Sequence, residues 1–196
     1  LVDWTQIEPA YIMVVKDTSH VAIFKTKYDG KMCVLNFASY KKPGGEYING
    51  AMAQEESLCH CSNLYKVLSD DKFKDDFYGY NNKHLNRALY GDRSIYSHDI
   101  VFFNSDKTKT KKCDVITCAA PNKKASQEYQ NVSDIEVNSV MKSRILHILD
   151  VAMRNNVKVL ILGAFGCGVF GNDTLTVAKI FKQCITDYYY FRNIFD

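Results

Sequence analysis

The sequence predicts a single α/β domain in which strands and helices form layers. In the second half of the chain, apolar runs of strand length alternate with segments of helical periodicity. Two glycine-rich loops each follow an apolar run and each lead into a helical segment. The 196 residues suffice for one sizeable core and contain no internal repeat, linker or low-complexity tract, so residues 1–196 are expected to form one domain.

Six apolar or β-branched runs have the length and composition of strands. Asp17-Thr18-Ser19 separates the first two and favours a hairpin, and the turn signal Asp29-Gly30 precedes the third. Pro121 and Asn122 end the fifth. The expected strands cover residues 11–15, 21–25, 31–36, 100–103, 114–118 and 157–162.

Three longer segments have helical periodicity. The first begins after Lys42-Pro43-Gly44-Gly45, which breaks regular structure, and the third begins behind the caps Asn172 and Asp173. The polar, tyrosine-rich segment 70–93 has no clear period, and we expect a surface excursion with short helical pieces. The expected helices cover 51–68, from Ser133 or Asp134 to about 154, and from 174 to about 188. The inner face of the second should carry Ile135, Val137, Val140, Met141, Ile145, Ile148, Leu149 and Ala152.

Composition and charge exclude several classes of protein. Hydrophobic residues make up 46% of the chain and the net charge is only +3, which excludes a disordered chain. No apolar run approaches the ~20 residues of a membrane span, and Asp3, Gln6 and Glu8 interrupt any signal-peptide pattern. Seven cysteines without framework spacing are typical of a reducing compartment, so we expect an intracellular protein, cytoplasmic or nuclear. We also expect a monomer.

Two further patterns are weak signals. The lysine-rich run 107–112 has no interleaved aromatic residues, which favours a solvated loop and no direct nucleic-acid binding. Cys59-His60-Cys61 falls within a predicted helix, where adjacent side chains diverge by ~100° and cannot converge on one ion. No metal and no cofactor are therefore expected.

The two glycine-rich loops, at 43–45 and 163–171, have the properties of a phosphate site. Glycines let a backbone approach a ligand closely, and the free N–H groups at a helix start attract anions. Each loop could equally be a tight turn on its own. Gly166-x-Gly168-x-x-Gly171 formally matches a dinucleotide fingerprint, but no further βαβ unit follows it, and the P-loop Gly-Lys-Ser/Thr is absent.

Gln54-Glu55-Glu56 stands at the opening of the first predicted helix. Acidic side chains in a first turn interact favourably with the helix dipole, so a capping role is one interpretation. Adjacent glutamates on a helix point in different directions and cannot form the facing carboxylate pair of ordinary glycosidases. One could reach a reactive bond while the other holds a neighbouring hydroxyl, as cleavage of a glycosidic bond beside a phosphate loop would require.

Several segments together resemble the signature of the microbial-type poly(ADP-ribose) glycohydrolases. They are Asn36-Phe37-Ala38-Ser39, Pro43-Gly44-Gly45 and Gln54-Glu55-Glu56, with 115–121 and 162–173 in agreement. The resemblance covers roughly half of the chain in pieces and keeps the order and spacing of the family.

The resemblance implies a macro-domain fold, a three-layer α/β/α arrangement with a mixed sheet of about six strands. It implies hydrolysis of the ribose–ribose bond of poly(ADP-ribose), with Glu56 as the catalytic acid and Glu55 holding ribose hydroxyls near Asn36. Such an acid needs a raised pKa near pH 7, which a closed cleft would supply. The partners implied are ADP-ribose and poly(ADP-ribose) on modified proteins. The substrate-binding residues implied are Asn36, Pro43, Gly44, Gly45, Gln54, Gly166, Cys167, Gly168, Val169 and Phe170, with Phe170 against ribose or adenine.

One position departs from the family pattern. Glu46 stands where the family has a third glycine. A carboxylate there would repel a diphosphate by ~1 kcal/mol, and its Cβ would restrict a positive φ. Either the side chain turns to solvent, or the loop and the activity are altered. Glu46 therefore favours an alternative, an ADP-ribose-binding module without activity, whereas Glu55 and Glu56 favour an enzyme. A hydrolase of mono-ADP-ribosylated substrates is a third possibility.

Overall fold

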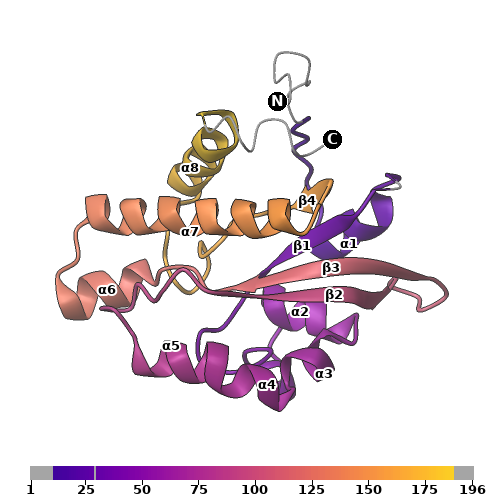
Figure 1. Ribbon diagram of the computed structural model, residues 1–196, viewed down its shortest axis with the longest axis horizontal. Helices are drawn as coiled ribbons and strands as arrows, with labels where there is room; N and C mark the ends of the chain where they lie inside the picture. Colours follow the sequence, from indigo (N-terminus) through magenta and orange to yellow (C-terminus); the bar gives the residue numbers. More distant parts are fainter. Residues whose placement is uncertain (1–10, 29, 188–196) are drawn as a thin grey trace.

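The protein folds around a mixed four-stranded sheet with strand order β2-β3-β1-β4 (Figure 1). The structure, a computed structural model, describes residues 11–28 and 30–187. The central strand β1 (Met32–Phe37) pairs in parallel with β3 (Thr110–Cys118) on one side and with β4 (Val159–Ile161) on the other. The edge strand β2 (Ser94–Phe103) runs antiparallel to β3.

Helices cover both faces of the sheet, which confirms the three-layer fold class (Figure 1). Because successive strand side chains alternate between faces, Cys33 and Leu35 pack with α7 (Asp134–Arg154) and α8 (Thr174–Asp187). Met32 and Val34 pack on the other face, with α1 (Ser19–Lys25), α2 (Gln54–His60) and α3 (Leu64–Leu68). Strands buried on both faces explain the continuous apolar runs in the sequence.

The expectation of six strands is wrong for the first two. Residues 11–15 are exposed and form no regular structure, and the second expected strand lies within α1. Thr18 caps this helix by accepting a hydrogen bond from the Val21 N–H at 3.3 Å, and Ile23 is fully buried beneath it. An effective N-cap and one buried face outweigh the β propensity of a short run.

The helix expected over 51–68 is also wrong in extent, because it is split into α2 and α3. The intervening residues pair with the edge of β2: the Phe103 N–H donates to Cys61 O at 2.7 Å, and the Asn63 N–H donates to Val101 O at 3.3 Å. The helix stops there because these residues supply backbone partners to an otherwise open sheet edge.

The excursion over 70–93 does contain short helical pieces: α4 (Asp71–Phe73), a π-helical segment (Lys74–Gly79) and α5 (Tyr80–Lys83). The 3-10 turn Tyr47–Asn49 and α6 (Lys123–Gln130) were not expected.

On α7, Ile135 is 84% exposed, so its assignment to the inner face is wrong. Asp3, Gln6, Glu8, Asp29 and Tyr188 lie outside the described residues. Within the described ranges, no helix is long and apolar enough to cross a membrane.

A buried arginine on α7 holds a strained segment near the sheet edge. Four non-glycine residues in this segment, Asn86, Arg87, Ala88 and Tyr90, have positive φ angles of 44°, 54°, 65° and 59°. Such angles cost roughly 1 kcal/mol each. Arg144, 1% exposed, bonds to Asp92 at 2.6 Å, to Leu89 O at 3.0 Å and to Ala119 O, so it connects the segment to the end of β3.

We predict that Arg144→Met lowers the free energy of unfolding by about 3 kcal/mol, because it removes the guanidinium that bonds to the Asp92 carboxylate and to two backbone carbonyls. Urea denaturation measures this. Arg154→Met is the matched control on the same helix, since Arg154 is exposed and pairs with Asp150 one turn away; its loss should stay within about 0.5 kcal/mol. Equal losses for the two variants would contradict the role given to Arg144.

Candidate active site

The candidate site lies where the parallel strands β1, β3 and β4 end, the edge of an α/β sheet at which ligands bind. Asn36, near the end of β1, is fully buried. Its Nδ2 donates to Glu55 Oε1 and to Thr117 Oγ1 of β3, both at 3.2 Å. Asn36 Oδ1 accepts no hydrogen bond from the described residues. Asn36 thus connects two strands to the first of the two glutamates.

Glu55 lies in the first turn of α2 and is only 3% exposed. Its Oε2 accepts the Ser39 N–H at 2.7 Å, while Oε1 accepts the bond from Asn36. The end of β1 and the residues just after it therefore hold both oxygens. Burial raises the pKa of Glu55 to about 7, and the charge of Glu56 adds to the increase, while the hydrogen bonds from Ser39 and Asn36 oppose it. Glu55 is therefore a carboxyl that titrates near neutral pH.

Glu56 is held by a different segment. It is 7% exposed, and its Oε1 accepts the Glu46 N–H at 2.9 Å. Gly45 lies against it with φ +56°, and a Cβ at this position would be 2.4 Å from Glu56 Oε1. The preceding Gly44 has φ +65°, and its Cβ would be 2.7 Å from the Tyr65 ring. Both positions therefore require glycine, for conformation and for space.

This geometry changes the interpretation of the first glycine loop. The glycines allow the loop to approach the protein's own carboxylates, and the Glu46 N–H donates to Glu56. Contacts of Pro43, Gly44 and Gly45 with a diphosphate stay a prediction.

The sequence left two alternatives for Glu46, a side chain turned to solvent or an altered loop, and the structure shows the first. Its side chain turns to solvent, where the carboxylate pairs with Lys42 at 2.6 Å and accepts a hydrogen bond from Asn49. These bonds, the one from Lys42 first, lower the pKa of Glu46. Its φ is −99°, so its Cβ causes no backbone strain. The missing third glycine does not obstruct the loop, whose contact with Glu56 uses only the backbone of residue 46.

Gln54, expected to bind substrate, has its side-chain amide bonded to the backbone of β1 and to Ser19. Gln54 precedes the two glutamates in the sequence, and its side chain bonds to the sheet. A contact of Gln54 with substrate stays a prediction.

The second glycine loop, after β4, is held against the end of β3. Gly166 has φ +72°, and a Cβ there would be 2.5 Å from Ala120 Cβ. Asn172 Nδ2 donates to Gly166 O and to Pro121 O, both at 2.9 Å. The tip of the loop is open, since Val169 is 85% exposed, and Gly168 has no atom close to the position of a Cβ. Contacts of Gly166, Cys167, Gly168, Val169 and Phe170 with a ligand remain a prediction.

Tyr90 lies between the two loops, a contact that no pattern in the sequence indicates. Its ring stacks on that of Tyr40, just before the first loop, with the ring centroids 4.2 Å apart. The centroid of the Phe170 ring, in the second loop, lies 6.3 Å from that of Tyr90. Tyr90 belongs to the strained segment that Arg144 holds. The two loops therefore share one site. Tyr90, which lies between them, belongs to the segment 70–93 that has no clear period in the sequence.

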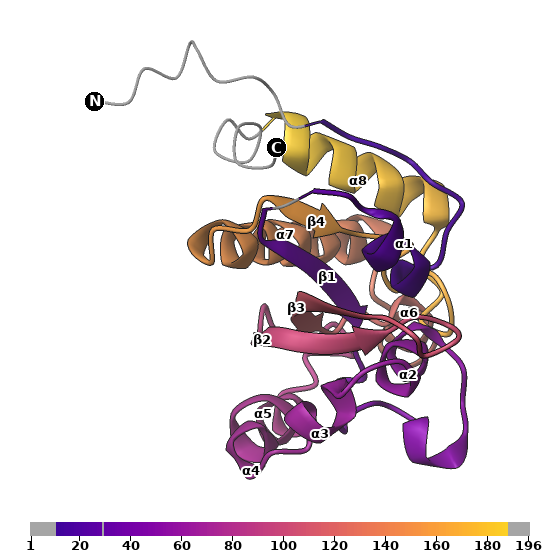
Figure 2. The same ribbon diagram turned by 90° about the vertical axis from the view of Figure 1, so that its right-hand side faces the viewer.

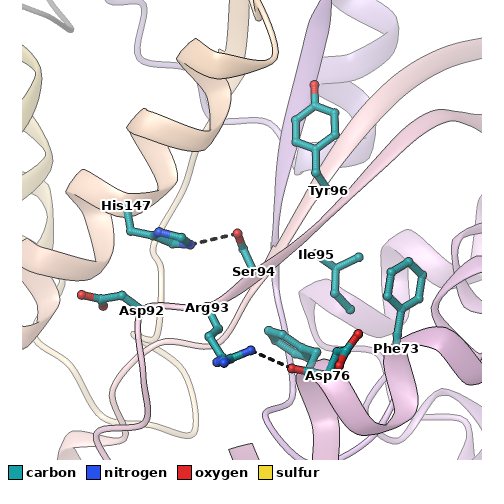
Figure 3. A pocket seen from close by; sticks show the side chains of 9 residues that line it. Phe73, Asp76, Asp92, Arg93, Ser94, Ile95, Tyr96 and His147 are labelled. Atoms are coloured by element: carbon teal, nitrogen blue, oxygen red, sulfur yellow. Dashed lines mark hydrogen bonds between the residues drawn. The ribbon is translucent and has the colours of Figure 1, made fainter. Parts of the chain in front are cut away.

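A cavity of about 380 Å³ lies elsewhere, beside the first residues of β2 (Figure 3). There His147 Nε2 contacts Ser94 Oγ at 3.0 Å, and Arg93 donates to Asp76 O at 3.0 Å (Figure 3). None of the predicted site residues lines it, so it is separate from the candidate site. Its lining consists of Phe73, Asp76, Phe77, Asp92, Arg93, Ser94, Ile95, Tyr96 and His147. The described part of the chain has no cluster of three metal-ligating side chains.

We predict that Glu55 makes folding stability depend on pH. Because its pKa rises from 4.5 to about 7 on folding, the folded state binds more protons between these values. Its contribution is complete below pH 4.5 and is lost as the pH rises through 7, amounting to about 3 kcal/mol. Chemical denaturation between pH 4 and 8 should show wild type losing stability relative to Glu55→Gln as the pH rises. Parallel pH profiles for the two proteins would contradict the raised pKa.

Comparison with known proteins gives consistent results. The family model described as "Microbial-type PARG, catalytic domain" matches residues 4–105, PARG being poly(ADP-ribose) glycohydrolase. A comparison with curated protein sequences gives no match. Poly(ADP-ribose) glycohydrolase from Thermomonospora curvata is 32% identical, with a TM-score of 0.85; the match covers 95% of this chain and 68% of that one.

Two ligand-bound structures are also similar. The enzyme from Deinococcus radiodurans in complex with ADP-ribose is 30% identical with a TM-score of 0.87, covering 97% of this chain and 76% of that one. The T. curvata enzyme bound to the inhibitor ADP-HPD is 31% identical with a TM-score of 0.78, covering 91% of this chain and 66% of that one. The signature segments, the three-layer fold and these similarities agree, and the chain belongs to the microbial-type poly(ADP-ribose) glycohydrolase family.

Proposed function

We propose that this protein is a poly(ADP-ribose) glycohydrolase that cleaves the ribose–ribose O-glycosidic bond and releases ADP-ribose. The observation that carries the proposal is the pair of buried, adjacent glutamates held by separate segments. Asn36 and Ser39 hold Glu55, whereas the first glycine loop holds Glu56. Two carboxylates in different environments can take different roles in one reaction.

Glu56 is the general acid in this proposal. The Glu46 N–H fixes its Oε1, so Oε2 is the oxygen that can carry the transferable proton. Donation of this proton to the bridging oxygen breaks the glycosidic bond and leaves an oxocarbenium-like ribose. A water molecule then adds to the anomeric carbon and returns a proton to Glu56, so atoms and charge balance over the cycle.

Glu55 holds the ribose. One of its oxygens accepts a hydrogen bond from Asn36 and the other accepts one from Ser39. A carboxylate has about four acceptor sites, so ribose hydroxyls can bind at those that remain. A carboxylate at this position also stabilises the positive charge that develops on the ribose.

The ligand is an ADP-ribose unit. The related structures with ADP-ribose and with ADP-HPD support this choice. In this chain, the open backbone around Gly168 and Val169 suits a diphosphate, and Phe170 offers an aromatic face to ribose or adenine.

We predict that Glu56→Gln lowers release of ADP-ribose from automodified poly(ADP-ribose) polymerase by about 10²- to 10⁴-fold, the typical contribution of a general acid. Affinity for ADP-ribose, measured by calorimetry, should remain within a few-fold because the loops are intact. Glu128→Gln is the matched control, an exposed glutamate on α6 that should retain full activity.

Two outcomes would contradict the proposal. Wild-type protein that binds ADP-ribose without releasing any from the polymer would be a binding module. Release from mono-ADP-ribosylated protein, with the polymer left intact, would identify a hydrolase of mono-ADP-ribosylated substrates.

A further inference from the structure

The central strand β1 is unequally paired on its two sides. On one side β3 pairs with it from Cys33 to Phe37. On the other side β4 pairs only with Met32, Cys33 and Val34 before the chain turns into the second glycine loop. Beyond Val34, no strand among the described residues pairs with the backbone groups of β1 that point toward β4. These groups lie at the carboxyl end of β1, the part of the strand that carries Asn36 of the candidate site.

The side chain of Gln54 occupies the place of the missing strand. Its Nε2 donates to Leu35 O at 2.8 Å and its Oε1 accepts the Phe37 N–H at 2.8 Å. In a parallel ladder, one residue of the neighbouring strand donates to residue i−1 and accepts from residue i+1 in the same way. The amide of Gln54 therefore reproduces, around Asn36, the two hydrogen bonds that one residue of a continued β4 would make.

This arrangement fixes the start of α2. The helix has seven residues, and its N-cap, Ala53, provides no side-chain hydrogen bond, so α2 has no conventional cap. Gln54 anchors its first turn to β1, and its second amide hydrogen is directed to Ser19 Oγ of α1 at 3.1 Å. Figure 2 shows α1 and α2 beside the carboxyl end of β1. The next two residues of the helix are Glu55 and Glu56.

We propose that Gln54 is a positioning residue, which sets the register of α2 on β1 and thereby places both glutamates. The inference rests on the proposed function for its effect on catalysis, but its structural part is independent of it. Both polar atoms of the amide are engaged by the protein. Direct contact of Gln54 with substrate stays a prediction, which the binding measurement below tests.

The structural part is tested by amide hydrogen exchange, followed by NMR in the free protein. Gln54→Met keeps the length of the side chain but removes both hydrogen bonds, so the Phe37 N–H should exchange about tenfold faster. The Ala38 N–H, which donates to Cys118 O at 3.0 Å on the β3 side, should remain protected. Gln54→Glu retains an acceptor for the Phe37 N–H but loses the donor to Leu35 O, so Phe37 should stay protected there.

The functional part is tested by steady-state kinetics. For both Gln54 variants we expect kcat to fall by about 100-fold, the effect of a displacement of reacting groups by about 1 Å. KM and the Kd for ADP-ribose should stay within about twofold, with a binding stoichiometry near one that shows a folded site. Ser19→Ala is the matched control: it removes only the third hydrogen bond of Gln54 and should keep kcat within about twofold.

The outcomes separate the two hypotheses. Unchanged exchange of the Phe37 N–H in Gln54→Met would overturn the role of Gln54 whatever the activity. A rise in the ADP-ribose Kd that matches the loss of kcat/KM would make Gln54 a ligand contact and would also overturn it. Wild-type protein without activity, but with the expected exchange pattern in the variants, would contradict the proposed function and leave the contact of Gln54 with β1 established.

Discussion

Two adjacent carboxylates buried at the start of a short helix are the constraint on which this structure depends. A carboxylate removed from water is stabilised only where hydrogen-bond donors replace the solvent. The protein supplies different donors to each: Asn36 and the Ser39 N–H for Glu55, and the Glu46 N–H for Glu56. Gly45 passes close to both carboxylates, since a Cβ there would lie 2.4 Å from Glu56 Oε1 and 3.2 Å from Glu55 Oε2. The loop could not take this path with a side chain at that position.

The surrounding elements keep these donors in place. The sheet fixes Asn36 beside Thr117, and Gln54 fixes the helix against the same strand. On the far side, Arg144 holds the left-handed segment from which Tyr90 reaches both glycine loops. One edge of the sheet therefore joins β1, β3, the start of α2 and the segment around Tyr90. The strain near Tyr90 is compensated by a buried arginine on α7. Backbone strain of this kind is characteristic of functional sites.

The sequence was sufficient for those features that depend on local pattern. The four strands of the sheet, α7 and α8 follow from apolar runs and periodicity, and the signature segments identified Asn36, Glu55 and Glu56 as a group. It failed where partners are distant along the chain. The run 21–25 is helical because Thr18 caps it and Ile23 meets the core. Gln54 bonds to a strand about 18 residues away, and no periodicity reveals which side-chain amide will replace a missing strand.

The first glycine loop differs from what its sequence predicts. Its composition indicates an anion site, and the departure at residue 46 suggested an obstacle to that site. In the structure, an N–H group of this loop binds a carboxylate of the protein, and the Glu46 side chain lies outside in a pair with Lys42. A backbone N–H is present whatever the side chain, so glutamate at position 46 can serve as well as glycine. Glycine at 45 has no such substitute, because there the constraint is the space beside Glu56.

The central claim, that the close approach of the loop at Gly45 lets the Glu46 N–H position Glu56, is tested most directly by the kcat of Gly45→Ala against that of Gly91→Ala. An added Cβ at 45 would lie 2.4 Å from Glu56 Oε1, whereas at 91 it would be 3.8 Å from the Tyr80 ring, an ordinary contact without a positive φ. We predict a loss of about 100-fold or more for Gly45→Ala and a change of less than about twofold for Gly91→Ala. Full activity in Gly45→Ala would contradict the account, since Glu56 could then act without the contact that positions it here.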